Sequence, residues 1–307
     1  MLPQATFADQ VVVGVDGSPS AAHAAEWAAV WAARTGRDLG LVAALGVMPR
    51  DRPDGQAIAT VMYDAFRNSV ADMLAQTAGE LRNRHPGLTV NTTVVWGDAA
   101  IVLVEVSQHA EVLVLGTRGL GGWQGLLMGG VADKVATHAR GPLVVVPPNV
   151  PLSGDGPVVL GVDDPETGSP RITFAVQAAQ VLGKPLVMIH AWQPPDMWRA
   201  IRRVSGSGEW ATIEADAQDR INRATEKVRA LDADLELLPR VVSANPVATL
   251  ADASGSAELV VLGSRGRGGW QGLLLGSTSR EMIQRTHCPL AIIRARPAPG
   301  QDKPAPL

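Results

Sequence analysis

The chain consists of two copies of one sequence joined end to end. Asp16 and Asp163 lie in matching segments, VGVDG and LGVDD, which are 147 residues apart. The same offset places EVLVLGTRGLGGWQGLLMGG, residues 111–130, over ELVVLGSRGRGGWQGLLLGS, residues 258–277, with most positions identical. Self-similarity over so long a period indicates a repeated structural unit. Because the offset stays constant through loops as well as apolar segments, we predict the duplication of a whole domain.

The boundary between the copies follows from composition. A chain of 307 residues has room for two domains of ordinary size. Residues 147–157 are rich in proline and glycine, which neither helix nor sheet tolerates well. We therefore expect a first domain over residues 1–150, a second over 157–296, and a disordered tail over 297–307, PAPGQDKPAPL.

Composition and charge exclude several classes of protein. Hydrophobic residues make up 46% of the chain, which is ample for buried cores. The net charge is -3, without a long run of either sign, which argues against a nucleic-acid binder. No apolar stretch approaches the roughly 18 residues of a membrane-spanning helix, and MLPQATFADQ at the start lacks the pattern of a signal peptide. We expect a cytoplasmic protein whose partners include neither nucleic acid nor membrane, with Cys288 packed as a small buried residue.

Within each copy, short apolar segments alternate with segments of helical periodicity. The predicted strands cover residues 11–15, 39–45, 88–96, 112–115 and 143–146, then 158–162, 186–191, 235–242, 259–262 and 290–293. In the first copy, helices are expected from Ser18-Pro19 to Gly36 and over 63–84, 99–109 and 131–139. This alternation predicts an α/β fold: two tandem doubly wound parallel-sheet domains, each a Rossmann-like α/β/α sandwich.

Ligands of open parallel sheets bind beyond the carboxyl ends of the strands, where the strand order reverses. Asp16 and Asp163 directly follow the first strand of each copy. An aspartate there can cap a turn or helix, or it can accept hydrogen bonds from a ribose hydroxyl or an adenine amine. Its recurrence in both copies favours the ligand-binding interpretation.

Two glycine clusters form the second part of the expected site. Residues 116–119, GTRG, follow the fourth strand, and nine residues later Gly129-Gly130 precedes a helix; the second copy has GSRG and Gly276-Ser277. Glycine lets the backbone approach a ligand, and the N–H groups that open a helix favour an anion. The pattern therefore predicts a cradle for a polyphosphate, in which Ser277 binds a phosphate oxygen or caps the helix. The spacing matches neither a P-loop nor a GxGxxG motif.

The pattern G-x2-G-x9-G-[ST] after a late strand, with Asp ending the first strand, resembles the ATP-binding class of the universal stress protein family. The resemblance spans nearly the whole chain as two family domains in tandem, a form common in actinobacteria. The second copy matches in full, whereas the first has Gly130 where Ser or Thr is usual. The resemblance implies ATP as the ligand, with Mg²⁺ as an optional companion, and a regulatory role in stress response or growth control.

Carried over position by position, the resemblance implies that Asp16 and Asp163 contact the adenosine moiety. Ala44 and Ala191 would bind adenine through their backbone. The implied nucleotide-binding residues are Gly14, Val15, Asp16, Ala44, Gly116, Arg118, Gly119, Gly129, Gly130 and Val131 in the first domain, and Gly161, Val162, Asp163, Ala191, Gly263, Arg265, Gly266, Gly276, Ser277 and Thr278 in the second.

Other side chains near these loops have two interpretations each. Arg118, Arg265 and Arg267 either approach the phosphates or are solvated loop residues. Trp123 and Trp270 either pack their loop, which we favour, or form an interdomain contact. His190 ends a strand beside the expected adenine site, but its counterpart is Ala43, so a satisfied, partly buried histidine is expected. Trp27 and Trp31 are expected in the core.

Three functions compete: a regulatory nucleotide-binding module, an enzyme acting on ATP, and a scaffold that binds no ligand. Efficient phosphoryl transfer needs a placed metal, neutralising groups and an oriented nucleophile. The glycine loops contain no lysine, and no acidic residue is matched in both. No Ser-His-Asp set recurs, and no His/Cys set has zinc-ligand spacing. We predict a non-enzymatic module, with slow hydrolysis or self-phosphorylation at Ser277 as the alternative.

Assembly is expected to involve the last strand of each copy, residues 143–146 and 290–293, because apolar edge strands tend to pair. Members of the resembling family dimerise through this strand, which implies a homodimer with additional pairing of the two halves inside one chain. Residues 50–63 and 193–210 are expected to be mobile loops, with Trp198 and Trp210 marking a contact surface.

Overall fold

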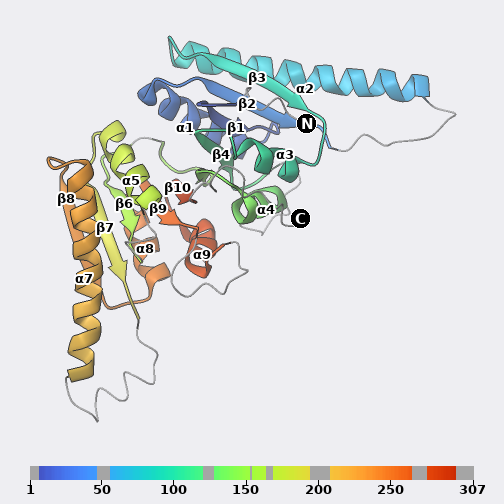
Figure 1. Cartoon of the computed structure of the whole chain (residues 1–307). Helices are drawn as coiled ribbons and strands as arrows, with labels where there is room; N and C mark the ends of the chain where they lie inside the picture. The colour runs from blue at the N-terminus through green and yellow to red at the C-terminus, as the bar shows by residue number, and fades with distance from the viewer. Residues whose placement is uncertain are drawn as a thin grey trace. The chain divides into compact units, whose positions relative to one another are not determined.

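The computed structural model describes residues 7–46, 56–119, 128–152, 154–163, 169–193, 208–264 and 275–294. These form two compact units, one comprising residues up to Asn149 together with Arg294, the other Val150–Ile293. The division falls inside the predicted link. Each unit is a parallel sheet flanked by helices (Figure 1), which confirms the predicted α/β fold class.

The sheet of the first unit has the strand order β3-β2-β1-β4-β5, and its paired strands are all parallel. The order reverses between β1 and β4, which is the position where open α/β sheets bind ligands. The strands are β1 (Val11–Gly14), β2 (Leu39–Ala44), β3 (Val90–Val95), β4 (Val112–Gly116) and β5 (Leu143–Val146). The helices are α1 (Pro19–Thr35), α2 (Gln56–Arg84), α3 (Ala99–Val106) and α4 (Gly130–His138).

The second unit repeats this topology as β8-β7-β6-β9-β10. Its strands are β6 (Val158–Gly161), β7 (Leu186–Ala191), β8 (Leu237–Val242), β9 (Leu259–Gly263) and β10 (Leu290–Ile293). Its helices are α5 (Ser169–Leu182), α7 (Gly208–Leu231), α8 (Pro246–Ser254) and α9 (Ser277–Arg285). The strand register also repeats, since Val11 lies beside Leu39 in one sheet and Val158 beside Leu186 in the other.

Helices cover both faces of each sheet because right-handed crossovers change face where the strand order reverses. In the first unit α1 and α2 pack together over one face, and α3 packs with α4. The whole of Val11–Val13 is inaccessible to solvent, as the unbroken apolar run predicted. Trp27 and Trp31 are buried in α1 with stacked rings 5.3 Å apart, which confirms their expected place in the core.

The ends of α1 follow from its sequence. Ser18 is the N-cap, and its hydroxyl oxygen accepts a hydrogen bond from the Ala21 N–H at 3.2 Å. Pro19 occupies the first turn, where no N–H is needed. Gly36 ends the helix in the left-handed conformation, with φ 64°, and Gly183 ends α5 with φ 65°.

Several predicted boundaries were wrong. Helix α2 begins at Gln56, so the expected loop over 50–63 is helical from residue 56, and α7 likewise begins at Gly208. Val61, Met62 and Phe66 are exposed and no residue over 61–70 is buried, so this part of α2 shows no buried stripe of the kind by which helices are recognised. Helix α3 ends at Val106, not at 109. The described structure contains neither Trp198 nor the expected tail, and it includes no side-chain description of Trp210.

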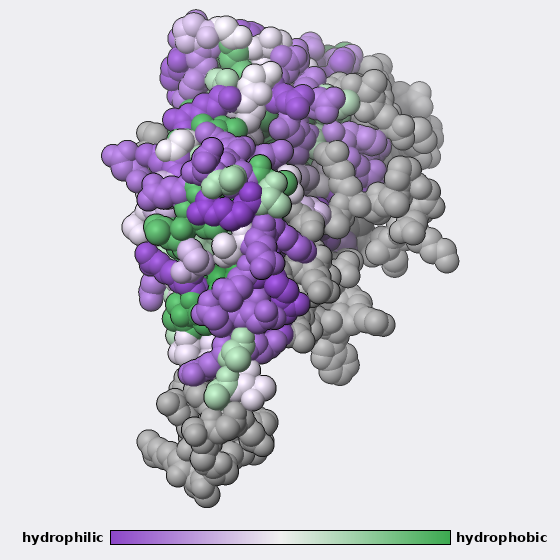
Figure 2. Space-filling model, turned by 60° about the vertical axis from the view of Figure 1, so that its left-hand side comes forward, coloured by the Kyte–Doolittle hydropathy of each residue, from purple (hydrophilic) through white to green (hydrophobic). Residues whose placement is uncertain are grey.

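Exposed apolar residues are scattered over the described surface. The large ones are Val61, Met62, Phe66, Ile101, Val131, Leu231 and Leu238. Hydrophilic residues cover most of the face drawn in Figure 2, with hydrophobic residues in small groups between them, as on an ordinary protein surface. Within the described ranges, no helix combines the length and apolar character needed to cross a membrane.

Candidate functional site

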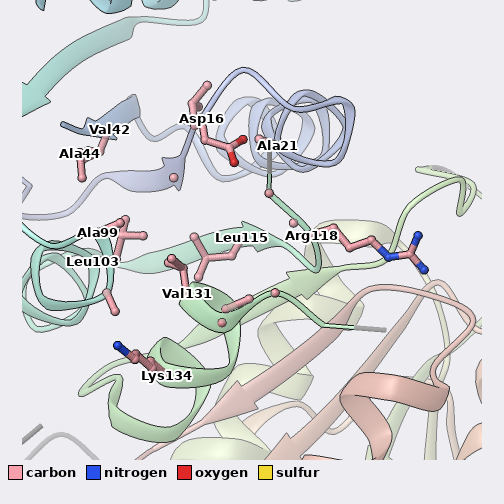
Figure 3. Close-up of a pocket in the computed structure, with 18 of the residues that line it drawn as sticks. Asp16, Ala21, Val42, Ala44, Ala99, Leu103, Leu115, Arg118, Val131 and Lys134 are labelled. Carbon is pink, nitrogen blue, oxygen red and sulfur yellow. The ribbon is translucent and has the colours of Figure 1, made fainter. Parts of the chain in front are cut away.

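A cavity of about 460 Å³ opens at the carboxyl ends of β1, β2 and β4 in the first unit (Figure 3). The amino ends of α3 and α4 complete its wall. Its volume is within the roughly 300–1,000 Å³ typical of small-molecule sites. The lining residues are Gly14, Val15, Asp16, Ala21, Val42, Ala44, Asp98, Ala99, Ala100, Leu103, Leu115, Gly116, Arg118, Gly119, Gly129, Gly130, Val131, Ala132 and Lys134.

All of the nucleotide-binding residues that the sequence predicted for the first domain line this one cavity. They come from segments up to 117 positions apart, between Gly14 and Val131. The structure thus brings the first-strand aspartate, the end of the second strand and both glycine clusters together. That these residues bind a nucleotide stays a prediction.

Asp16 serves a turn and borders the cavity at the same time. Its Oδ1 accepts a hydrogen bond from the Ser18 N–H at 3.0 Å, just before α1. Figure 3 shows its carboxylate across the cavity from Val131, which lies in the first turn of α4. The two interpretations of this aspartate, turn residue and ligand contact, are therefore compatible.

The glycines on the cavity wall differ in what an added side chain would contact. A Cβ on Gly119 would lie 2.4 Å from the Asp16 Oδ2, so a larger residue there would require the loop or the Asp16 side chain to shift. A Cβ on Gly116 would lie 2.5 Å from the Ser20 hydroxyl oxygen, and one on Gly14 would lie 2.7 Å from a Leu115 methyl group. These two glycines serve packing between a strand and its neighbours. Among the glycines that line the cavity, only Gly130 could accept a Cβ with no other atom within 4 Å of it.

The amino end of α4 is bare. Gly129 is its N-cap and makes no side-chain capping hydrogen bond. The Gly129 N–H donates to the Thr117 carbonyl at 2.8 Å, and the first helical bond runs from the Asp133 N–H to the Gly129 carbonyl at 3.0 Å. The N–H groups at the start of the helix therefore have no capping side chain, and together with the helix dipole they favour an anion.

Arg118 borders the cavity in the described structure, and whether it approaches the phosphates of a bound ligand stays a prediction. Its side chain is exposed, and Figure 3 shows the guanidinium directed away from the other cavity residues. The Arg118 backbone ties the loop to α1, because its N–H donates to the Ser20 hydroxyl oxygen and its carbonyl accepts from the Ser18 hydroxyl, each at 3.4 Å.

Sequence reasoning missed part of the wall. Asp98 lines the cavity as the N-cap of α3, where its Oδ1 accepts from the Ala100 N–H at 2.9 Å and the Ile101 N–H at 3.2 Å. An aspartate before an apolar helical run was a usable capping signal. Lys134 lines the cavity from the second turn of α4, whereas the sequence predicted phosphate-binding cations only in the glycine loops. Lys134 follows Gly130 by four residues, and residues four apart lie on the same face of a helix, so this spacing could have placed the lysine beside the glycine loop.

The described part of the second domain repeats the uncapped helix start and the strand-end hydrogen bond of the first domain. Gly276 is the N-cap of α9 without a side-chain cap, and its N–H donates to the Ser264 carbonyl at 2.7 Å. Ser277 is therefore the first helical residue, with an exposed side chain, and the alternative that it caps the helix is wrong. Val162 donates to the Ile189 carbonyl at 2.8 Å, as Val15 does to Val42.

Other predicted residues of the second site have known positions. Gly161, Ala191 and Gly263 end β6, β7 and β9, Asp163 follows β6 by two positions, and Thr278 is the second residue of α9. The remaining loop residues lie outside the described ranges: Arg265, Gly266, Arg267 and Trp270, with Leu120 and Trp123 of the first domain.

Two side chains distinguish the second domain. The buried His190 places its Nδ1 2.7 Å from the Val162 carbonyl, which confirms a satisfied histidine. The buried Arg220 forms an ion pair with Asp216 at 2.7 Å and donates to the Asp163 carbonyl at 3.2 Å. Met73 occupies the position of Arg220 in the first copy, so the two domains hold the loop after their first strand differently.

The one cysteine of the sequence, Cys288, is buried away from the cavity. Burial raises the pKa of the Cys288 thiol to about 12, so this cysteine is a packed, protonated residue. Among the residues that the structure describes, no three His, Cys, Asp or Glu side chains are grouped so as to hold a metal ion.

Comparison with known proteins agrees with the repeat and the fold. The model of the Universal stress protein family matches residues 8–147 and again 156–294. A universal stress protein of Mycolicibacterium smegmatis is 30% identical over 298 residues, covering 93% of this chain and 97% of that protein. One of Mycobacterium tuberculosis H37Rv is 30% identical over 295 residues, covering 92% and 96%.

A solved structure shows the same fold. The crystal structure of a universal stress protein from Archaeoglobus fulgidus superposes with a TM-score of 0.65 at 17% identity, covering 94% of this chain and 99% of that one. With two family matches that together span most of its length, the chain belongs to the universal stress protein family as a tandem pair of its domains.

Proposed function

We propose that the first-domain cavity binds ATP, and that the protein acts as a nucleotide-binding regulator in stress response or growth control. The observation that carries the proposal is a single cavity with an uncapped helix terminus on one wall and the Asp16 carboxylate on the other. The helix terminus suits the phosphate end of a nucleotide, and the carboxylate suits the ribose of its nucleoside end.

The phosphate end of the ligand belongs at α4. The N–H groups of its first turn donate to phosphate oxygens, and the helix dipole adds a favourable field. Gly130 leaves room for this approach, because no atom lies within 4 Å of the position of a Cβ. Lys134 adds a positive charge to the same wall.

The nucleoside end belongs between Asp16 and the ends of β1 and β2. The carboxylate of Asp16 accepts hydrogen bonds from ribose hydroxyls. Apolar side chains on the cavity wall cover the faces of the base, as is usual in ligand pockets; they are Val15, Val42, Ala44, Ala99 and Leu103. Ala44 lies at the end of β2, where backbone groups are available to the edge of adenine.

The second domain is proposed to bind a nucleotide in the same way. Its α9 has the same uncapped amino end, and Ser277 adds a hydroxyl that the first domain lacks. Mg²⁺ would accompany the phosphates if ATP enters as its magnesium complex.

The role is proposed to be regulatory, not enzymatic. Both carboxylates of the described cavity already have structural tasks, since Asp16 holds the turn before α1 and Asp98 caps α3. Efficient phosphoryl transfer needs a placed metal, neutralising groups and an oriented nucleophile, and the residues that line the described cavity include no carboxylate beyond these two. A regulator requires only that the nucleotide bind one state more tightly than another. We also propose a cytoplasmic homodimer; pairing of the two halves through β5 and β10 stays a prediction.

The test is to denature the purified full-length protein and identify the released nucleotide by mass spectrometry, with its molar ratio to protein. We expect ATP at between one and two molecules per chain, and thermal stabilisation when ATP is added to stripped protein. At 100 times the Kd the stabilisation is about 2.7 kcal/mol. A protein that releases no nucleotide and gains no stability in millimolar ATP would be a scaffold, and steady multiple turnovers would indicate an enzyme.

A further inference from the structure

The first two turns of α4 and α9 differ in a correlated way. Helix α4 begins with Gly130 and has Lys134 one turn later, whereas α9 begins with Ser277 and has Glu281 one turn later. At this position the domain that lacks the hydroxyl has a cation and the domain that has the hydroxyl has an anion. The two charges lie at equivalent positions of the repeat, 147 residues apart. The preceding position has the opposite charges, Asp133 in α4 and Arg280 in α9, but Asp133 is not among the residues that line the described cavity.

Helix geometry places Lys134 above the bare amino end of α4. Residues four apart lie on one face of a helix about 5.4 Å apart along its axis, and their Cα–Cβ bonds tilt toward the N-terminus. Lys134 belongs to the cavity wall, and the space over Gly130 is open. Because glycine has no side chain there, the lysine can extend over it to an anion at the helix terminus.

The Lys134 ammonium is available for a ligand. The side chain is exposed, and it forms no hydrogen bond or ion pair with a residue of the described ranges. Figure 3 shows it on the α4 wall beyond Val131, at the side of the cavity formed by Leu103 of α3. A lysine is a flexible point charge with three donors, so it can follow a mobile phosphate.

At the equivalent position of the second domain, Glu281 has the opposite charge. Its carboxylate lies 3.9 Å from the guanidinium of Arg285, one turn further along α9. A carboxylate near the helix terminus repels a phosphate, and each added phosphate charge increases the repulsion.

We propose that Lys134 is a specificity-determining residue that binds the distal phosphates in the first domain and makes this domain prefer ATP over AMP. The inference rests on the proposed nucleotide binding. In the second domain, the Glu281 carboxylate reduces this preference, so one chain contains a triphosphate-selective site and a less selective one.

The test compares ATP and AMP binding to the full-length protein by titration calorimetry. Hydrogen exchange of residues 130–138 and 277–285 assigns each event to a domain. The Lys134→Met variant is expected to lose about tenfold in ATP affinity at the first domain, as befits one charge-assisted hydrogen bond, with AMP affinity changed less than about twofold. The loss should shrink at high salt, and Lys134→Arg should retain most of the affinity.

Two further variants serve as controls. Lys184→Met removes the same charge at the amino end of β7, opposite the ligand end of the sheet, and should leave both affinities unchanged. Glu281→Lys should raise the ATP preference of the second domain. An unchanged ATP-to-AMP affinity ratio in Lys134→Met overturns the inference and leaves the proposed function standing. If ATP slows hydrogen exchange in neither α4 nor α9 of the wild-type protein, both this inference and the proposed function are wrong.

Discussion

An added methyl group should change the free energy of unfolding in opposite directions at two glycines of the cavity wall, Gly119 and Gly130. In Gly119→Ala the new Cβ would lie 2.4 Å from the Asp16 Oδ2, closer than a carbon and an oxygen can approach. Either the loop moves or Asp16 rotates and loses its 3.0 Å hydrogen bond from the Ser18 N–H. Gly119 and Asp16 are both exposed, so this rearrangement costs less than one in a core, and we expect about 0.5–1.5 kcal/mol, the worth of one hydrogen bond.

Gly130→Ala is the matched control. The added Cβ meets nothing within 4 Å, and the backbone there is helical. Alanine has less conformational freedom to lose on folding than glycine, so we expect no destabilisation and a gain of up to about 1 kcal/mol.

The assay is differential scanning calorimetry, with hydrogen exchange of β1 and β4 to assign the transition to the first domain. A domain of this size shifts its Tm by about 3 °C per kcal/mol, so Gly119→Ala should lower it by about 2–5 °C. ATP affinity should fall as well, because Asp16 is displaced. The reasoning is refuted if Gly119→Ala is as stable as the wild type, or if Gly130→Ala is destabilised equally.

Three further predictions concern groups outside the first cavity. The Cys288 thiol ionises near its ordinary pKa of 9.0 in the unfolded chain, whereas burial raises its pKa to about 12 in the folded protein. The stability that the buried thiol contributes is therefore complete below pH 9 and declines above it. In unfolding curves measured at alkaline pH, Cys288→Ala should flatten this decline. His190→Ala, which installs the first-copy residue, leaves the Val162 carbonyl without its 2.7 Å partner and should cost about 1–3 kcal/mol, measured by urea unfolding of the second domain. The hydrogen bond from Gln180 lowers the pKa of Asp232, so the stability that this carboxylate contributes is present above its ordinary pKa of 3.8 and is lost as pH falls below it. NMR titration of wild-type protein should show the lowered pKa, and Gln180→Ala should raise it toward 3.8.

Local chemistry was sufficient to predict the repeat and most of the strands. The run Val11–Val13 is apolar without alternation, and only a strand buried on both faces accommodates that pattern. Ser18 and Gly36 mark the ends of α1 because capping and the left-handed conformation depend on the identity of single residues. The sequence also directed attention to the residues that follow the strands, because parallel sheets bind ligands at the carboxyl ends of their strands; the strand order that places the switch point between β1 and β4 came from the structure.

What depends on contacts between distant segments could not be predicted from the sequence. The sequence shows a glycine at 116 but not that it faces Ser20 of α1, so its packing role was hidden behind an expected ligand role. The start of α2 was missed, and the apolar residues described near it, Val61, Met62 and Phe66, are exposed and form no buried stripe. Lys134 joined the site because the second turn of α4 faces the same cavity as β1. Strand pairing between segments far apart along the chain decides such contacts, and periodicity within one segment contains no information about them.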